Sequence, residues 1–262
     1  MLHTSRFKRR QMGALAWGAF WVSASIFCLS PKLALAQTQT SSASYPTKPI
    51  RLVVPFPAGG ATDIFARTLS QKLGEKIGSS VVVDNKPGAG GTLGSDLVAK
   101  SVADGYTILL ATSSTHSIGP NLNPRMPYDA VRDFTPIAQV GNAPSIMLVP
   151  NSSPAKTIQE WIEFAKKNPG KLNMASGGNG TTGHLGGELF KALAGVFMVH
   201  VPYRGAGPAI TDLIAGGVDL MFDNIASSIP HIRSGRLRAL GVSGAQRSPV
   251  MPEVPTIEEA GL

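Results

Sequence analysis

Short apolar runs alternate with segments of helical periodicity from residue 45 onward. Runs rich in β-branched residues and bounded by Gly or Pro indicate strands. In the first part of the chain, strands are expected at 51–54, 81–83 and 106–110. Between the first two, apolar side chains recur at the i, i+4 spacing of one helical face, at Phe65, Leu69, Leu73 and Ile77. A second helix is expected over residues 92–98.

The second part of the chain repeats this alternation. Strands are expected at 137–140, 145–149, 172–175, 197–201, 218–222 and 237–242, and helices at 157–167, 208–215 and 226–233. The first of these helices starts at Thr157, a capping residue with Glu160 in capping-box register. A further helix follows a Gly-rich loop and carries Leu185, Leu189 and Leu193 on one face. Strand–helix alternation of this kind predicts α/β layers with mostly parallel sheets.

The alternation divides into two α/β lobes, each expected to be a mostly parallel sheet flanked by helices. The first lobe is expected over residues 45–140 and the second over residues 141–244. The Pro-rich tail, residues 245–262, is expected to return to the first lobe.

Residues 1–36 are expected to be a secretory signal peptide and not part of the fold. Four basic residues within the first ten give a positive start, an apolar run follows, and small residues precede the expected cleavage after Ala36. Cleavage there predicts a periplasmic mature chain. Cys28, the only cysteine, lies in this leader, so the mature chain would have no disulfide and no thiol chemistry.

The leader also carries much of the positive charge. The formal net charge is +8, but five of the 24 basic residues and none of the 16 acidic residues lie in residues 1–36. The mature chain then has 19 basic against 16 acidic residues, a balance of +3. This mild excess favours an anionic ligand. No basic stripe with interleaved aromatic residues is present, so nucleic acid is not an expected partner.

The loop after the first strand is a candidate anion site. The strand runs into Gly59 and Gly60, and a helix begins directly afterwards. The first turn of a helix leaves backbone N–H groups unpaired, and small residues let an anion approach them. The alternative is an ordinary loop capped by Thr62 or Asp63. Asp63 itself is expected to cap the helix or to pair with Arg67, not to contact a ligand.

A second Gly-rich loop has the same strand–loop–helix pattern. Its residues 178–183 match G-x-G-x-x-G, and Arg204 lies about 20 residues further on, as in an NADP-binding domain. An NADP-linked enzyme is therefore an alternative interpretation. The export signal argues against it, because soluble nicotinamide cofactors belong to the cytoplasm.

Three further positions follow predicted strands. Ser113 and the serine after it could donate to an anion, although such residues often only satisfy a turn. Asn224 could hydrogen-bond a ligand. Arg204 could clamp a carboxylate, but a structural pairing with Asp212 or Asp219 is favoured.

Catalytic motifs are absent from the sequence. It contains no G-x-S-x-G elbow, no Walker loop and no H-E-x-x-H. The histidines beyond the leader are isolated from one another along the chain, at positions 116, 184, 200 and 231. Isolated histidines favour structural roles over metal ligation. No enzymatic activity, cofactor or metal is therefore expected.

Several segments resemble, in order, the motifs of the Bug family, the periplasmic receptors of tripartite tricarboxylate transporters. They are YPTKPI at 45–50, VPFPAGGATD at 54–63, NKPGAGG at 85–91, DGYT at 104–107, YRG at 203–205 and PEVPT at 252–256. A series of motifs is more specific than any single loop. The resemblance covers residues 45–262.

The resemblance implies a two-lobed periplasmic-binding-protein fold of type II that closes on a ligand in the cleft between the lobes, with hinges near Val140 and Gly244. It implies a small carboxylate ligand (a di- or tricarboxylate, an amino acid or an aromatic acid), held by backbone N–H groups and hydroxyls and delivered to the membrane subunits of a transporter. A sensory protein that feeds a signalling partner is the alternative. A monomer is expected. The expected ligand-binding residues are Phe56, Ala58, Gly59, Gly60, Ala61, Thr62, Ser113, Ser176, Gly177, Gly180, Thr181, Thr182 and Asn224.

Members of this family continue beyond the EEAGL stretch at residues 258–262 with helices and a strand that complete the first lobe. We therefore expect the first lobe of this sequence to expose apolar surface and to have low thermal stability.

Overall fold

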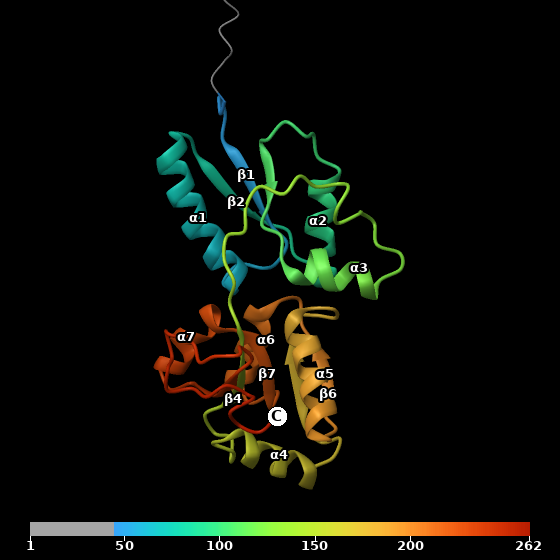
Figure 1. The fold of residues 1–262 in the computed structure, drawn as a ribbon, viewed down its shortest axis with the longest axis vertical. Helices are drawn as coiled ribbons and strands as arrows, with labels where there is room; N and C mark the ends of the chain where they lie inside the picture. Colours follow the sequence, from blue (N-terminus) through green and yellow to red (C-terminus); the bar gives the residue numbers. More distant parts are fainter. Residues whose placement is uncertain (1–44) are drawn as a thin grey trace, which may run out of the picture. The chain divides into compact units, whose positions relative to one another are not determined.

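The computed structural model describes residues 45–262 as two α/β lobes, each built on its own sheet (Figure 1). The expected signal peptide, residues 1–36, lies outside the described residues. Among the described helices, none combines the length and the apolar character needed to cross a membrane.

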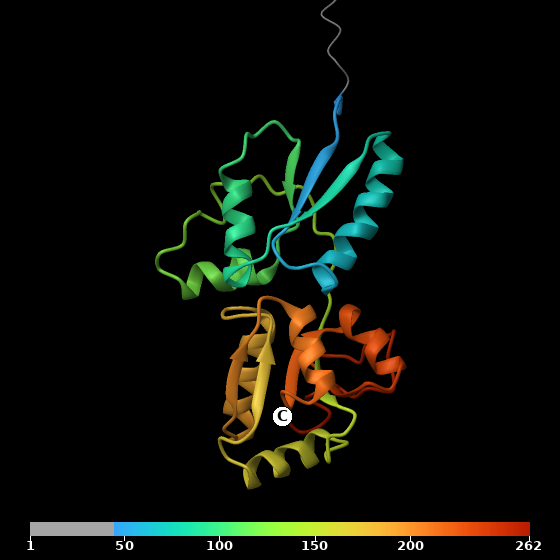
Figure 2. The same cartoon turned by 180° about the vertical axis from the view of Figure 1, so that it is seen from behind.

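The first lobe is a small parallel sheet of order β2-β1-β3. Its strands are β1 (Ile50–Val54), β2 (Val81–Asn85) and β3 (Thr107–Leu109), and its helices are α1 (Ala61–Ile77), α2 (Thr92–Ala99) and α3 (Gly119–Leu122), with short turns η1 (Ala89–Gly91) and η2 (Ser114–Ile118). Helix α1 runs beside β2, and α2 lies by β3 (Figures 1 and 2). The core is small, because only Leu52, Val54 and Ala66 form its buried cluster.

The second lobe has a five-stranded sheet of order β6-β5-β7-β4-β8. Its strands are β4 (Ser145–Pro150), β5 (Asn173–Ser176), β6 (Val199–Pro202), β7 (Leu220–Asn224) and β8 (Leu237–Val242). Its helices are α4 (Ile158–Lys167), α5 (Thr182–Ala194), α6 (Ala206–Ala215) and α7 (Ile225–Arg233). Only β4 runs against its neighbours.

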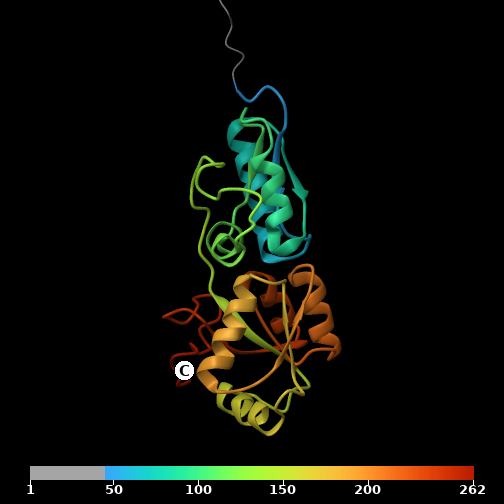
Figure 3. The same ribbon diagram turned by 90° about the vertical axis from the view of Figure 1, so that its right-hand side faces the viewer.

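Alternate residues of this sheet belong to two separate cores, one on each face, because neighbouring side chains in a strand point to opposite faces. Met147 and Met174 join the core under α4 and α5, where Trp161 is 1% exposed. Ile146 and Ala175 join the core under α6 and α7. Helices α5 and α6 accordingly lie on opposite sides of the sheet (Figure 3).

The predicted cap of α4 is confirmed. The Thr157 hydroxyl accepts a hydrogen bond from the Glu160 N–H at 3.1 Å. The Glu160 carboxylate accepts from the N–H of Lys156 at 2.6 Å, one residue earlier than in a capping box.

The predicted helix α5 is confirmed, but the face that carries Leu189 and Leu193 is not the face that packs on the sheet. Leu189 and Leu193 are each 60% exposed, whereas Phe190 and the glycines Gly183 and Gly187 are buried. The glycines allow close approach to the sheet, since a methyl group on Gly183 would overlap the Phe222 carbonyl oxygen of β7. The lack of a side chain at these glycines therefore determines which face of α5 packs on the sheet.

The strand expected at residues 137–140 is also absent. This segment is extended coil, and Ile137 is 79% exposed. Within residues 45–262 its backbone N–H and C=O groups have no hydrogen-bond partner. A strand requires a neighbouring ladder, and β3, the edge of the first sheet, is not paired with this segment.

The tail packs on the second lobe and does not return to the first, as had been expected. Val242 at the end of β8 donates to the Pro255 carbonyl at 2.9 Å and accepts from the Ile257 N–H at 2.9 Å, which makes a parallel bridge to Thr256. Met251 is buried in the core under α6 and α7. The open edge of β8 therefore captures the tail.

The glycine packing of α5 gives a matched pair of variants. Gly183→Ala should lower the free energy of unfolding by about 1–3 kcal/mol, because its methyl group meets rigid backbone. Gly186→Ala places a methyl group 3.7 Å from Phe222 at the nearest. It should be neutral or stabilising by up to about 1 kcal/mol. Urea denaturation of both variants checks this, and equal effects would contradict the packing.

Candidate functional site

The loop that enters α1 meets the loop that enters α6. A methyl group on Gly205 would overlap the ring of Pro57, and one on Gly60 would lie 3.9 Å from the Ala206 Cβ. Gly177, directly after β5, is equally close, because its methyl group would lie 3.4 Å from the Ala206 nitrogen. Three strand–helix junctions, one from the first lobe and two from the second, therefore converge.

A second contact between the lobes lies at the start of α5. The Thr182 N–H donates to the buried Ser114 hydroxyl at 3.2 Å. Nearby, a methyl group on Gly90 would lie 2.7 Å from the Asn179 carbonyl oxygen. A hydrogen bond and van der Waals contacts therefore connect the lobes at the start of α5 as well as at the converging junctions.

Asp63 organises the start of α1. Its carboxylate accepts from the Gly59 N–H at 3.0 Å, from Arg67 Nε at 2.9 Å and from Asn85 Nδ2 at 3.0 Å. Burial alone would raise the pKa of Asp63, but these hydrogen bonds lower it below its ordinary value. The predicted pairing with Arg67 is confirmed, and Asp63 remains an anion that fixes the loop.

The Gly59 N–H is therefore already hydrogen-bonded and is not free for a ligand in this structure. The N–H groups of Ala61 and Thr62, the first two residues of α1, have no acceptor among residues 45–262. These two groups carry the partial positive charge of the helix start. In this loop, the N–H groups that can bind an anion are therefore those of Ala61 and Thr62, not that of Gly59.

Ser176 and Thr181 hold the second loop in place. The Ser176 hydroxyl is fully buried and accepts from the Gly178 N–H at 3.1 Å. Thr181 caps α5, because its hydroxyl accepts from the His184 N–H at 3.4 Å and donates to the Gly178 carbonyl at 2.7 Å. The N–H groups of Gly177 and Gly183 have no acceptor within the described part of the chain.

Several other predicted site residues have structural partners. The ring of Phe56 packs where a methyl group on Gly91 would lie 3.0 Å from its Cζ. The Asn224 side chain caps α7 by accepting from the Ala226 N–H at 3.0 Å. Ser113 precedes η2 and caps it with no side-chain hydrogen bond, and Ser114 is the residue that reaches the second lobe.

The expected structural pairing of Arg204 is wrong. Asp212 is bound by the Tyr203 hydroxyl, and Asp219 accepts from the Asn173 N–H at 2.8 Å. Within residues 45–262, exposed Arg204 takes part in no ion pair. Among the described residues, the positive charge of Arg204 is therefore not paired, and it lies directly before Gly205, the residue that contacts Pro57.

Two contacts between the lobes were not predicted as such from the sequence, those of Gly90 and Ala206. Both lie in glycine-rich loops that follow strands. The glycine-rich composition marked both loops as candidates, but composition does not identify which loops face each other.

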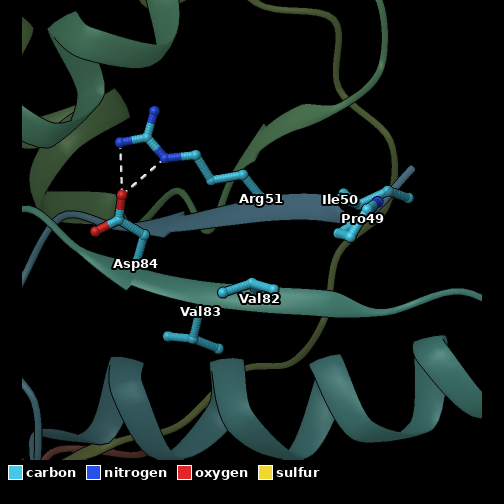
Figure 4. A pocket seen from close by; sticks show the side chains of 6 residues that line it. All are labelled: Pro49, Ile50, Arg51, Val82, Val83 and Asp84. Atoms are coloured by element: carbon cyan, nitrogen blue, oxygen red, sulfur yellow. Dashed lines mark hydrogen bonds and ion pairs between the residues drawn. The ribbon is translucent and has the colours of Figure 1, made fainter.

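Two depressions are also present, and the second includes Thr182 at the start of α5 in its lining. One, of about 380 Å³, is lined by β1 and β2 residues Pro49, Ile50, Arg51, Val82, Val83 and Asp84 (Figure 4). Arg51 Nε donates to Asp84 at 2.7 Å, so the two charges compensate each other. The other, of about 460 Å³, lies beside α5 and is mainly apolar. Within residues 45–262, no cluster of three or more His, Cys, Asp or Glu side chains is placed to hold a metal ion.

Residues 65–262 match the tripartite tricarboxylate transporter family receptor, TctC. The chain belongs to this family. The receptor is 47% identical over 233 residues to the UPF0065 protein in the tcbD-tcbE intergenic region of Pseudomonas sp. strain P51, covering 87% of this chain and 69% of that protein. It is 40% identical to Protein BugT of Bordetella pertussis, covering 84% of this chain and 68% of that protein.

Solved structures of similar proteins share the fold. Rpa4515 of R. palustris with adipate is 39% identical, with a TM-score of 0.81 over 83% of this chain and 73% of that chain. MatC of Rhodopseudomonas palustris with bound malate is 34% identical, with a TM-score of 0.79 over 83% of this chain and 74% of that chain. The predicted family and the periplasmic-binding-protein fold are thus confirmed, and the family is one of solute-binding receptors, not of enzymes.

The contact at Gly90 gives a prediction with a closely matched control. Gly90 and Gly78 have almost the same backbone angles, with φ of 64° and 66°. Alanine at either position should therefore cost about 1 kcal/mol of stability. Only Gly90→Ala also meets the second lobe, whereas nothing lies within 4 Å of a methyl group on Gly78.

Small-angle X-ray scattering should show a larger radius of gyration for Gly90→Ala than for Gly78→Ala. Identical scattering of the two variants would mean that the Gly90–Asn179 contact does not limit the approach of the lobes.

Proposed function

We propose that the receptor captures a small carboxylate between its lobes and delivers it to the membrane subunits of a tripartite tricarboxylate-type transporter. The chemical basis is the convergence of the starts of α1 and α6 with the β5–α5 loop. Their N–H groups are free of acceptors in the described residues, at Ala61, Thr62, Ala206 and Gly177. Helix starts attract anions through these N–H groups and through the helix dipole.

Glycine makes the proposed site accessible. Gly60 and Gly177 place no side chain between the three junctions, so a carboxylate oxygen can approach the backbone to hydrogen-bonding distance. The buried Asp63 carboxylate supports the α1 loop from behind through Gly59. The ligand is therefore expected to depend mainly on backbone donors, with the hydroxyl of Thr62 as a further candidate.

The proposed ligand class is supported by the receptor's relatives. Two proteins of the same fold, 39% and 34% identical to the receptor, are described with adipate and with malate. Both are dicarboxylates, and we propose a ligand of the same class, with tricarboxylates, amino acids and aromatic acids as further candidates. Exposed Arg204 directly precedes Gly205, and we propose it as a cation for a second carboxylate.

The proposed place of action is the periplasm, reached through the predicted signal peptide. Capture there would proceed by closure of the lobes, stabilised only by contacts that exist in the closed form. In the described chain the lobes are joined by residues 141–144, while the tail after Gly244 stays on the second lobe. We therefore propose a hinge at residues 141–144.

A thermal-shift screen of carboxylic acids tests the proposed function. A ligand that binds only the folded state raises the melting temperature. Adipate, malate, citrate, glutamate and benzoate cover the proposed classes. Two controls resemble adipate: hexanoate lacks its second carboxylate, and the diamide of adipic acid lacks both carboxylates. No shift with any carboxylate at millimolar concentration would contradict the proposal.

Gly60→Leu gives a sharper test of the site. The backbone at Gly60, with φ −82° and ψ 169°, suits any residue, so the variant should fold. Its side chain would fill the space toward Ala206 and should weaken binding of the best carboxylate at least about tenfold, or about 1.4 kcal/mol. Gly60→Ala should retain affinity within a few-fold. Isothermal titration calorimetry of both variants decides, and wild-type affinity in Gly60→Leu would exclude this site.

A further inference from the structure

Two histidines hold the two ends of the second Gly-rich loop. His184 on α5 and His200 on β6 stack with ring centroids 4.1 Å apart and an interplanar angle of 24°. The Gly180 N–H donates to His184 Nδ1 at 3.2 Å. His200 Nε2 lies 2.6 Å from the Ser176 hydroxyl oxygen. One imidazole pair thus contacts residues 176 and 180, on either side of the loop's centre.

The first of these contacts requires a neutral ring. A backbone N–H can only donate, so Nδ1 of His184 must accept and its proton must be on Nε2. Protonation of Nδ1 would remove the acceptor for the Gly180 N–H. The neutral imidazole of His184 therefore fixes this end of the loop.

The second contact favours a neutral ring as well. The Ser176 oxygen already accepts from the Gly178 N–H, so its own proton is best given to His200 Nε2. If His200 were protonated, Nε2 would donate instead, and the Ser176 proton would have to turn to the Gly178 carbonyl, 3.2 Å away. That carbonyl already accepts from the Thr181 hydroxyl at 2.7 Å and from the Thr181 N–H at 3.3 Å, which uses both of its lone pairs.

The surroundings of His200 do not favour a second proton on its ring. Glu188 faces His184 at 3.9 Å, but its carboxylate is bound by Lys191 at 2.8 Å. Strands β5 and β6 contribute no ionisable group here other than His200. Burial first, and then the neighbouring His184, hold the pKa of His200 below its ordinary value of 6.5, with Lys191 acting in the same direction and Glu188 against it.

We propose that His184 and His200 are positioning residues whose neutral imidazoles hold the 176–180 loop in its binding conformation, so that protonation of His200 at acid pH loosens the loop and weakens carboxylate binding. This inference deepens the proposed function and rests on it for its effect on affinity. The sign follows from linkage: a histidine with a lowered pKa favours the ordered loop at neutral pH, and this contribution is lost as pH falls below about 6.5.

The first experiment needs no ligand. Nitrogen-15 NMR of the wild-type protein from about pH 8 to about pH 5 should show the amide signals of Gly178 and Gly180 shifting together with the His200 imidazole. In the double variant His184→Asn, His200→Gln, amide groups replace Nδ1 and Nε2 as acceptors that do not titrate. Its glycine signals should stay fixed over the same range.

The second experiment measures affinity, with adipate and malate as probes. Between about pH 8 and about pH 5 the wild type should lose roughly two- to tenfold more affinity than the double variant, the value of one to two hydrogen bonds. Titration of the probe itself is the same for both proteins and cancels in this ratio. His231→Asn, which removes an imidazole on α7, should behave as the wild type.

The outcomes are separable. Glycine amides that ignore the imidazole titration would overturn the positioning role, and an affinity ratio that is flat or rises toward acid pH would overturn its effect on binding. If the double variant does not fold, His200→Gln alone and the wild-type NMR titration still decide. Failure of every carboxylate to bind at any pH would count against the proposed function, while the NMR result would still test the loop.

Discussion

A peptide N–H in the first turn of a helix has no carbonyl within that helix to bind, and it must find water, a side chain or a ligand. In this receptor the α1 and α6 starts lie next to each other and beside the β5–α5 loop. Some of their N–H groups are satisfied internally, as Gly59 is by Asp63 and Thr182 by Ser114. The remaining ones define where an anion can be held without a buried cation.

The second constraint is that backbone segments must approach each other closely. Glycine allows this approach both where a helix packs on a sheet and where the lobes meet. Gly183 lets α5 settle on β7, which sets the position of the helix start. Gly205 and Gly90 let the lobes touch at Pro57 and at Asn179. A side chain at any of these positions would displace a helix or a lobe by the width of a methyl group. In a site built from helix starts, such a displacement removes the hydrogen bonds.

Much of this architecture could be predicted from sequence, because it depends on local pattern. Strand β1, the α1 and α5 starts and the Thr157 cap follow from apolar runs, glycines and capping chemistry within a few residues. The pairing of Asp63 with Arg67 follows from helical spacing. The same local information identified the candidate loops, and the structure brings the α1, α5 and α6 loops into contact through Gly60, Gly177 and Gly205.

The features that sequence analysis did not predict depend on partners that are distant in sequence. The exposure of Leu189 reflects how closely Gly183 meets β7, which periodicity cannot measure. Residues 137–140 have strand composition but no neighbouring ladder, and the tail joined β8 because that edge was open. At the site, Ser113 and Ser114 are equivalent by composition, and only the three-dimensional path of η2 brings Ser114 to α5.

A crystal structure of the receptor with adipate would test the central claim most directly. We predict one carboxylate group within about 3 Å of the N–H groups of Ala61 or Thr62 and of Ala206 or Gly177, so that both lobes donate to the same ligand. Adipate bound to a single lobe, or held by lysine and arginine side chains with these N–H groups unused, would contradict the account.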